Sequence, residues 1–180
     1  ETGVCIMQMA AGLDTGPVLK RLSLPIKTED TAQTLHDKLA KLGADALLST
    51  LDDLPALQTQ ATPQDAAQSC YAEKLQKAEA IIDWQQSAAQ IDRQIRAFNP
   101  WPVAQTVWRD ETLRIWSATL SREALTGRAG EIVRAERDAL LVATGDGILN
   151  IRQIQLPGKR SMPVADLLNS QTIKTGEQLG

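Results

Sequence analysis

One carboxylate on a glycine-flanked turn is the clearest candidate for chemistry in this chain of 180 residues. Asp14 lies in the run Gly12-Leu13-Asp14-Thr15-Gly16-Pro17, which closely follows the apolar stretch Val4–Met9. Small residues beside it permit a tight turn and let a ligand approach the backbone. A loop after a strand in an α/β sheet often carries catalytic residues, and a carboxylate there suits proton transfer. Because Asp also favours ordinary turns, this pattern alone leaves a plain turn as the alternative.

Two strands and a helix are predicted to position Asp14. The strand-like stretch Val18–Ile26 follows the turn, so the segment is expected to form a strand, a turn and a strand. Asp30 and Gln33 have the spacing of a capping box, which predicts a helix over residues 31–51. The apolar residues of this helix recur at helical spacing: Leu35, Leu39, Leu42, Ala46 and Leu47.

A polar segment divides the chain. Residues 58–69 show no apolar period and contain Pro63, which is typical of a surface linker. The predicted organisation is the end of one domain at residues 1–56, a linker at 57–76 and a second domain at 77–180.

The second domain is predicted to begin with a helix and continue as strands. Asp83 and Gln86 repeat the capping-box spacing, and an apolar stripe then runs as far as the segment Asn99-Pro100-Trp101-Pro102. The stripe consists of Trp84, Ala88, Ile91, Ile95 and Phe98. Five short strand-like pieces follow, at residues 103–109, 112–118, 131–135, 139–144 and 149–156. Five strands with turns between them suggest a small barrel or sandwich, and five is the strand count of the oligonucleotide-binding (OB) fold.

Two tryptophans of the second domain have two interpretations. Trp101 and Trp108 could stack on nucleic-acid bases, as aromatic residues on OB surfaces do. Because Trp101 lies between two prolines and Trp108 alternates within a strand, burial is the prediction for both.

The charge balance excludes a strongly basic nucleic-acid binder. Residues 1–70 carry five Lys or Arg against nine Asp or Glu, and residues 71–180 carry 14 against 13, so any RNA contact must come from local patches. Cys5 and Cys70 lack the spacing of a metal site or a disulfide framework. The sequence contains no run of about 18 apolar residues, which is the length that a membrane-spanning helix needs. We expect a reduced cytoplasmic protein without a metal, with His36 solvated beside the apolar stripe of its helix.

Four motifs in order resemble one family of folate-dependent enzymes. They are the segment from Glu1 through the Asp14 turn, residues 83–88 with 95–102, residues 145–149, and residues 157–162. In order and spacing they resemble the bacterial methionyl-tRNA formyltransferases over nearly the whole chain. The resemblance implies an α/β C-terminal remnant of a Rossmann-like formyltransferase domain, followed by an OB-like β-barrel domain with a leading helix.

The resemblance implies transfer of a formyl group from 10-formyltetrahydrofolate, as co-substrate, to the methionyl amine of initiator methionyl-tRNA. Asp14 would be the catalytic residue. The implied folate-binding residues are Gly12, Leu13, Asp14, Thr15 and Gly16. In the family an Asn and a His of an earlier Asn-x-His segment complete the catalytic set. This chain lacks both, so it is expected to be a C-terminal portion that is inactive by itself.

The tRNA is expected to contact the linker and the second domain, mostly through its backbone. The candidate tRNA-binding residues are Lys74, Lys77, Arg93, Arg96, Lys159 and Arg160. Each of these cations taken alone could equally be ordinary solvated surface. Two other functions stay open, namely a related formyltransferase that acts on an amino sugar nucleotide and a module that only binds RNA. A monomer is expected.

Overall fold

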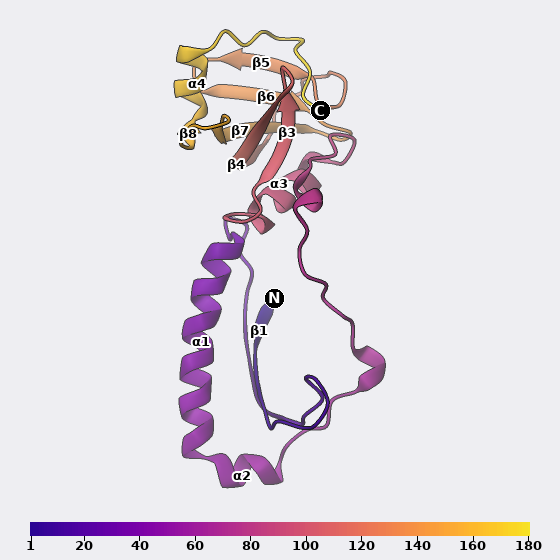
Figure 1. Ribbon diagram of the computed structural model, residues 1–180, viewed down its shortest axis with the longest axis vertical. Coiled ribbons are helices and arrows are strands. Elements are labelled where there is room, and N and C mark those ends of the chain that lie inside the picture. Colours follow the sequence, from indigo (N-terminus) through magenta and orange to yellow (C-terminus); the bar gives the residue numbers. More distant parts are fainter. The chain divides into compact units, whose positions relative to one another are not determined.

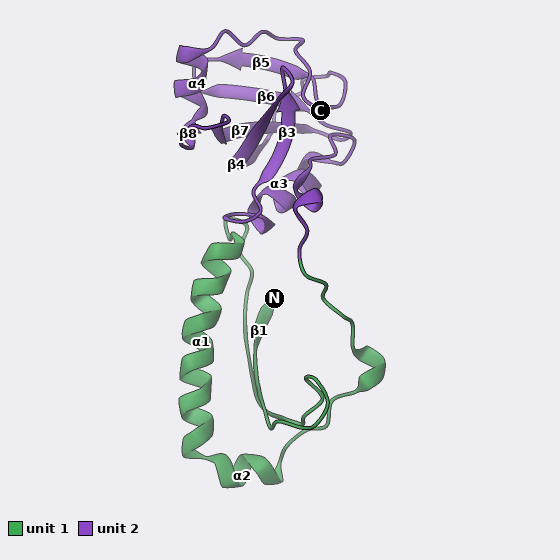
Figure 2. Cartoon of the chain, viewed as in Figure 1, with its two compact units in different colours: residues 1–74 green, residues 75–180 purple.

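The computed structural model describes residues 1–180, which form two compact units. Unit 1 spans Glu1–Lys74 and unit 2 spans Leu75–Gly180 (Figure 2). The division falls inside the segment 57–76 that the sequence suggests as a linker. No helix in the chain is both long and apolar enough to cross a membrane.

Unit 1 is a two-stranded sheet with a long helix against it. Strands β1 (Thr2–Met7) and β2 (Val18–Leu24) pair antiparallel. Helix α1 (Ala32–Asp52) packs on both strands and is followed by the short helix α2 (Leu54–Thr59) (Figure 1). A single 3₁₀ turn, η1 (Ala66–Gln68), comes later in the unit. The predicted strand, turn, strand and helix are therefore confirmed.

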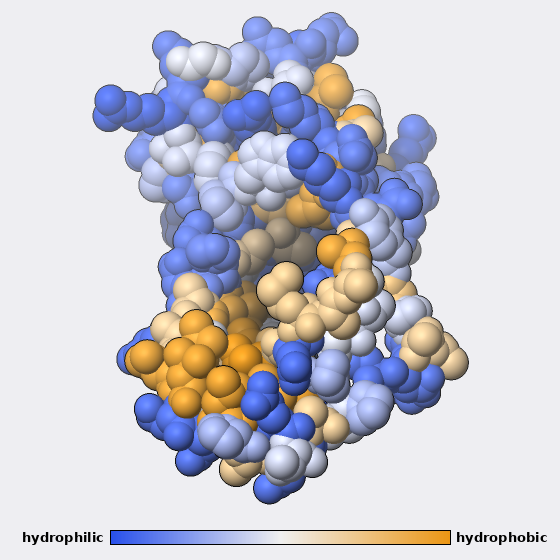
Figure 3. Space-filling model, turned by 60° about the horizontal axis from the view of Figure 1, so that its bottom comes forward, coloured by the Kyte–Doolittle hydropathy of each residue, from blue (hydrophilic) through white to orange (hydrophobic).

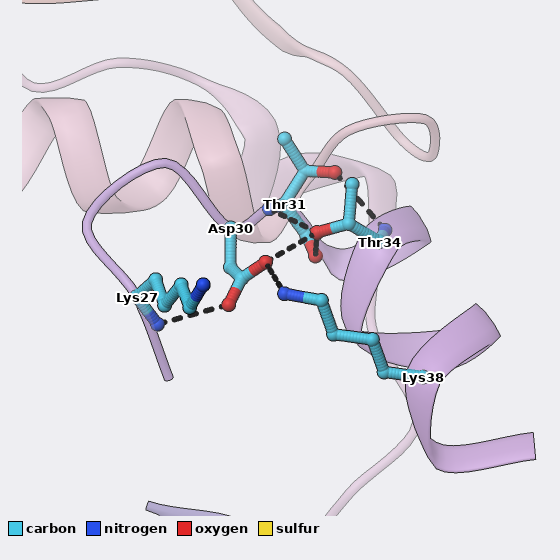
Figure 4. Close-up of polar contacts among 5 residues, drawn as sticks. All are labelled: Lys27, Asp30, Thr31, Thr34 and Lys38. Atoms are coloured by element: carbon cyan, nitrogen blue, oxygen red, sulfur yellow. Dashed lines mark hydrogen bonds and ion pairs between the residues drawn. The ribbon is translucent and has the colours of Figure 1, made fainter. Parts of the chain in front are cut away.

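A buried carboxylate organises the start of α1, but it is not the cap that the sequence suggested. Thr31 is the N-cap and forms a reciprocal capping box with Thr34. Asp30 instead accepts hydrogen bonds from the Lys38 ammonium, the Thr34 hydroxyl and the backbone N–H of Lys27 (Figure 4). The Lys38 ammonium is the main reason that the pKa of Asp30 falls from 3.8 to about 2. The predicted capping role of Asp30 was wrong because its oxygens are used by these partners.

The outer side of α1 is unusually apolar for an exposed helix. Leu47, Leu48 and Leu51 are 46%, 64% and 56% exposed. A large apolar area is visible in the lower part of the view in Figure 3. Contiguous apolar surface of this kind marks a place where other protein or ligand surface normally packs.

Unit 2 begins with two short helical elements and continues into a sheet. The 3₁₀ turn η2 (Lys77–Ala80) precedes helix α3 (Ala88–Ala97). The strands are β3 (Ala104–Trp108), β4 (Glu111–Ser121), β5 (Ile132–Glu136), β6 (Ala139–Ala143), β7 (Ile148–Gln155) and the two-residue β8 (Met162–Pro163). Helix α4 (Val164–Ser170) follows β8 (Figure 1). All five predicted strands are confirmed, whereas β8 and α4 were not predicted.

The sheet of unit 2 is antiparallel and open. Its strand order is β3-β4-β7-β6-β5, with β8 paired to β7. No pairing joins β3 to β5, so hydrogen bonds do not close this sheet into the barrel that we expected. The fold shown is therefore a mixed arrangement of helices and an antiparallel sheet.

The leading helix of unit 2 starts later than its sequence pattern suggests. Ser87 is the N-cap of α3 and its side chain accepts from the N–H of Gln90. Asp83 instead accepts from the backbone N–H of Gln85 and the side chain of Gln86 in a turn before the helix. Trp84 lies in that turn and is buried, with its indole N–H donating 3.0 Å to Thr106 Oγ1. The apolar stripe therefore packs into the core although it is only partly helical.

The two tryptophans with open interpretations behave differently. Trp108 is 6% exposed, so its predicted burial is confirmed. Trp101 is 50% exposed, so its predicted burial was wrong. The flanking prolines Pro100 and Pro102 restrict the backbone but do not force the indole inward.

The C-terminal segment is tied to β3 by one carboxylate. Glu177 accepts hydrogen bonds from the Arg109 guanidinium at 2.8 and 3.1 Å and from the Trp108 indole N–H at 2.8 Å. The Arg109 guanidinium also lies over the Trp108 ring, 4.3 Å from its centre. The Arg109 hydrogen bonds are the largest reason that the pKa of Glu177 falls from 4.5 to about 2, against the opposing effect of partial burial.

Candidate functional site

Asp14 lies at the tip of the loop that joins β1 to β2. Its backbone adopts a left-handed conformation with φ of 51°, which Asp tolerates better than most residues. The residue is exposed, and its carboxylate forms no hydrogen bond or ion pair within the chain. A carboxylate held in this way is available to accept a proton or a hydrogen bond from a ligand.

Small residues let the loop fold against itself. Gly16 is buried, and a Cβ added there would lie 1.7 Å from the carbonyl oxygen of Gln8, so only glycine fits. Next to it, the N–H of Gln8 donates 3.0 Å to the Pro17 carbonyl. At the other end of the turn the Thr15 hydroxyl donates 3.1 Å to the Gly12 carbonyl. The Asp14 loop is thus a defined structure and not an open connection.

Gln64 clamps this loop from a distant part of the sequence. Its side-chain amide donates to the carbonyl oxygens of Asp14 and Gly16, at 2.8 and 2.7 Å. Val18 and Thr62 exchange backbone hydrogen bonds of 2.8 and 2.9 Å, which brings Gln64 to the loop. Sequence reasoning missed Gln64 because it lies in a segment that resembles a featureless linker. The one sequence feature that could have drawn attention to Gln64 is that it directly follows Pro63.

Asp14 is the only side chain of the Asp14 loop that could take part in proton transfer. His36, which was expected to be solvated, has a side chain that is 76% exposed and lies 3.4 Å from Asp37. No group of three or more His, Cys, Asp or Glu side chains is arranged to hold a metal ion. One carboxylate can relay a proton, but stabilising an oxyanion needs hydrogen-bond donors aimed at it.

The six candidate cations of the linker and the second domain differ in their availability. Lys74, Lys77, Lys159 and Arg160 are exposed. Arg93 is also exposed and donates 2.7 Å to Gln90. Arg96 forms an ion pair with Asp92, with its Nε 3.0 Å from a carboxylate oxygen, and its side chain is only 21% exposed. Arg96 is therefore the least available of the six candidates for a phosphate.

Two small cavities lie on the sheet of unit 2, and Lys77 is the one candidate cation that lines either of them. The first cavity has a volume of 260 Å³, and its lining includes Lys77, Trp101, Arg114 and Trp116. The second has a volume of 270 Å³, and its lining includes Arg114, Gln155, Pro157 and Gly158. Gln105 and Arg114 line both. Neither Arg93 nor Arg96 lines either cavity. Arg114 had not been singled out because a lone arginine in a strand carries no sequence signal.

A third cavity lies elsewhere in unit 2. It has a volume of 340 Å³ and is lined by Ala135, Glu136, Arg137 and residues 168–173. None of the candidate functional residues borders it.

Two families match the chain. The family described as "Formyl transferase, C-terminal domain" matches residues 74–172, and the family described as "Formyl transferase" matches residues 1–51. The Asp14 loop lies within the second match, and both cavities lie within the first.

Curated relatives match along the whole chain. A methionyl-tRNA formyltransferase of Hydrogenovibrio crunogenus is 49% identical over 180 residues, which are 100% of this chain and 57% of that protein. Methionyl-tRNA formyltransferases of Nitrosococcus oceani and Dechloromonas aromatica are 49% and 46% identical over 97% and 99% of this chain, which correspond to 54% and 56% of those proteins. The chain thus spans a little over half the length of these relatives.

Solved structures share the fold at lower identity. HypX from Aquifex aeolicus matches 96% of this chain and 31% of its own, with a TM-score of 0.71 and 20% identity. An N-formyltransferase from Helicobacter canadensis matches 85% of this chain and 55% of its own, with a TM-score of 0.64 and 19% identity. Identities this low establish the shared fold and nothing finer.

Proposed function

This chain belongs to the formyl transferase family, and we propose that it forms part of a methionyl-tRNA formyltransferase. With the portion of the formyl transferase domain that the chain does not span, it would transfer a formyl group from 10-formyltetrahydrofolate to the amine of initiator methionyl-tRNA. The observation that carries the proposal is the match of 46–49% identity to three proteins of this name along at least 97% of the chain.

Asp14 has a geometry that suits a proton relay in this reaction. The neutral methionyl amine forms a bond to the formyl carbon, and the bond from that carbon to folate N10 then breaks. The amine must lose a proton, and N10 must gain one. The exposed Asp14 carboxylate can accept and return a proton, because no partner within the chain occupies it.

The rest of the loop would contact the folate and hold Asp14 in place. We propose Gly12, Leu13, Thr15 and Gly16 as folate contacts, because the loop is glycine-flanked and Leu13 is 83% exposed. Gln64 would act as a positioning residue, since it fixes the backbone on both sides of Thr15. Oxyanion stabilisation by an Asn and a His would have to come from outside this chain.

Unit 2 would bind the tRNA backbone. The supporting observations are the four exposed candidate cations of this unit and an antiparallel sheet whose main path has five strands, which is the strand count of OB-like domains. Phosphate contacts predict an affinity that falls with salt and carries little sequence information. Because the proposed substrate is charged tRNA, the proposal places the protein in the cytoplasm.

A chimera tests the proposal directly. This chain replaces the matching 180 residues of the Hydrogenovibrio protein, to which it aligns without leaving any of its own residues unmatched. The chimera is expected to formylate initiator methionyl-tRNA, and Asp14→Asn is expected to lower kcat by about a hundredfold or more, as loss of a general acid or base does. Asp45→Asn on the exposed side of α1 is the matched control.

Two results would contradict the proposal. One is a folded chimera that formylates an amino sugar nucleotide but not methionyl-tRNA. The other is an Asp14→Asn chimera with the same kcat as its parent, which would return Asp14 to the role of an ordinary turn residue.

A further inference from the structure

Two cavities share Gln105 and Arg114 as lining residues on the outer face of β3 and β4, and we term the two cavities together the Trp101 groove. Gln105 and Arg114 are directly paired across these strands, and Trp116 is the next residue of β4 on the same face. The groove has Lys77 at one end and the turn that contains Pro157 and Gly158 at the other.

Two indoles give the groove its flat apolar surfaces. Trp101 is half exposed, which is rare for a side chain that gains so much from burial. Trp116 is partly buried, and its indole N–H donates 3.0 Å to Gln155. Gln155 in turn donates 2.8 Å to the carbonyl of Lys159, so the ring of Trp116 is held in one orientation.

The segment that carries Trp101 is also fixed. The side chain of Asn99 donates 3.0 Å to the carbonyl of Trp116, and the N–H of Val103 donates 3.0 Å to the carbonyl of Phe98. Val103 has a φ of 69°, which a β-branched residue adopts only where its surroundings impose it. Trp101 is therefore presented to solvent by a defined loop, and ordering it costs little when a ligand binds.

The charge of the groove is positive and unmatched. Lys77 and Arg114 line it and take part in no ion pair, and no Asp or Glu lines either cavity. Lys159 and Arg160 follow the turn at its far end and are exposed. Unpaired cations beside exposed indole rings suit a ligand that has both a planar ring and a negative charge.

We propose that the Trp101 groove binds an unpaired nucleotide of an RNA, with its base stacked on Trp101 and a phosphate beside Arg114 and Lys77. Each cavity, at 260–270 Å³, is below the range of about 300–1,000 Å³ for drug-sized ligands, which suits one base. Paired bases of an RNA helix are turned inward, whereas unpaired bases stack readily on aromatic side chains. That the ligand is RNA rests on the proposed function.

The test compares single-stranded and duplex RNA. Fluorescence anisotropy measures binding of the whole chain to a short labelled single-stranded RNA and to a fully paired duplex of equal length. The single strand is expected to bind more tightly. Trp101→Ala is expected to weaken its binding about tenfold, as loss of one stacked base does, while Trp101→Phe retains most of the affinity. Val107→Ala, on the same sheet face and 44% exposed, is the control and leaves binding unchanged.

The charge contribution is measured through salt dependence. Arg114→Ala is expected to reduce the steepness of the plot of log affinity against log salt concentration by about one, which corresponds to the loss of one phosphate contact. Arg122→Ala removes the same charge from an exposed position outside the groove and is expected to leave the slope unchanged.

Three results would contradict the proposal that the Trp101 groove binds an unpaired nucleotide. They are no binding of any RNA, equal binding of the Trp101→Ala and Val107→Ala variants, and equal loss of slope for Arg114→Ala and Arg122→Ala. Formylation by the chimera separates this proposal from the proposed function. If the chimera is active but Trp101→Ala does not change RNA binding, only the proposal of nucleotide binding in the groove is contradicted. If the chimera is inactive but RNA binding depends on Trp101, only the proposed formyltransferase activity is contradicted.

Discussion

Unit 1 and unit 2 are stabilised very differently. Unit 1 has two strands, and Ala46 is its only fully buried hydrophobic residue. Every other buried hydrophobic residue of the chain lies in unit 2, where helix α3 and the sheet enclose a continuous core. Helix α1 packs on the two strands of unit 1 without making a fully buried apolar core, whereas the six strands and helix α3 of unit 2 enclose a core of the kind that an independent domain needs. Unit 2 thus has the structure of a self-sufficient domain, and unit 1 does not.

The difference separates the two candidate sites as well. The Asp14 loop belongs to unit 1, and its shape depends on local hydrogen bonds and on the Gln64 clamp. The Trp101 groove lies on the outer face of the sheet in unit 2, with the core directly behind it. A site on a rigid sheet keeps its geometry without further support, whereas a loop on a thinly packed unit needs surrounding structure.

Separating the units should have the largest effect. Residues 75–180 expressed alone are expected to unfold cooperatively, with a midpoint close to that of the whole chain, because their core is complete. Residues 1–74 alone are expected to show no cooperative transition, because they contain a single fully buried hydrophobic residue. Circular dichroism during urea titration measures both. A cooperative fragment 1–74, or an unfolded fragment 75–180, would reverse the comparison.

One leucine in each unit gives the next largest contrast. Leu149→Ala removes a fully buried side chain from the core of unit 2 and is expected to lower the free energy of unfolding by about 2–5 kcal/mol. Leu48→Ala makes the same change at a side chain that is 64% exposed on α1, and about 0.5 kcal/mol or less is expected. Circular dichroism during urea titration measures the Leu48→Ala variant, and the fluorescence of the four tryptophans, which all lie in unit 2, measures the Leu149→Ala variant. Equal effects of the two changes would mean that the Leu149 environment is not a packed core.

The Glu177 carboxylate is expected to have a smaller, pH-dependent effect. Its pKa is lower in the folded chain, about 2, than its ordinary value of 4.5, so its stabilising effect is complete above pH 4.5 and is lost as pH falls toward 2. Glu177→Gln is expected to cost about 2 kcal/mol at neutral pH, as loss of a charged hydrogen-bond partner does, and to reduce the acid sensitivity of unit 2.

Unfolding in urea, followed by tryptophan fluorescence at neutral pH and near about pH 3, measures both quantities. Glu111→Gln is the control, because Glu111 is exposed and forms no ion pair. If the Glu177 and Glu111 variants had the same acid sensitivity, the contact with Arg109 would carry no net stability.

The Gln64 clamp should give the smallest effect, and it acts on activity. Gln64→Glu keeps the shape but removes the amide donor and places a carboxylate beside two carbonyl oxygens. In the chimera it is expected to lower kcat about tenfold, equal to about 1.4 kcal/mol, with a smaller change in KM. Gln60→Glu at an exposed position is the matched control. An unchanged kcat for Gln64→Glu would show that the loop needs no support from this segment.

Local patterns in the sequence predicted most of the elements. The strands around Asp14, helix α1 and the five strands of unit 2 were all recognisable, because alternation and helical spacing are set by residues near one another in the chain. The predicted first residues of the helices were less accurate than the predicted elements themselves. Asp30 and Asp83 both have the spacing of a cap, but Thr31 and Ser87 take that role, because several adjacent residues can cap and long-range partners decide among them.

The sequence by itself determined most of the strands and helices, the family resemblance and the identity of Asp14 as the catalytic candidate. Only the tertiary structure decided that Gln64 holds the Asp14 loop, that Trp101 is exposed, that Arg114 lies between two cavities and that the sheet stays open. Each of these depends on contacts between residues far apart in the chain. Such contacts leave no periodic pattern in the sequence, because they are fixed by how the elements pack and not by the elements themselves.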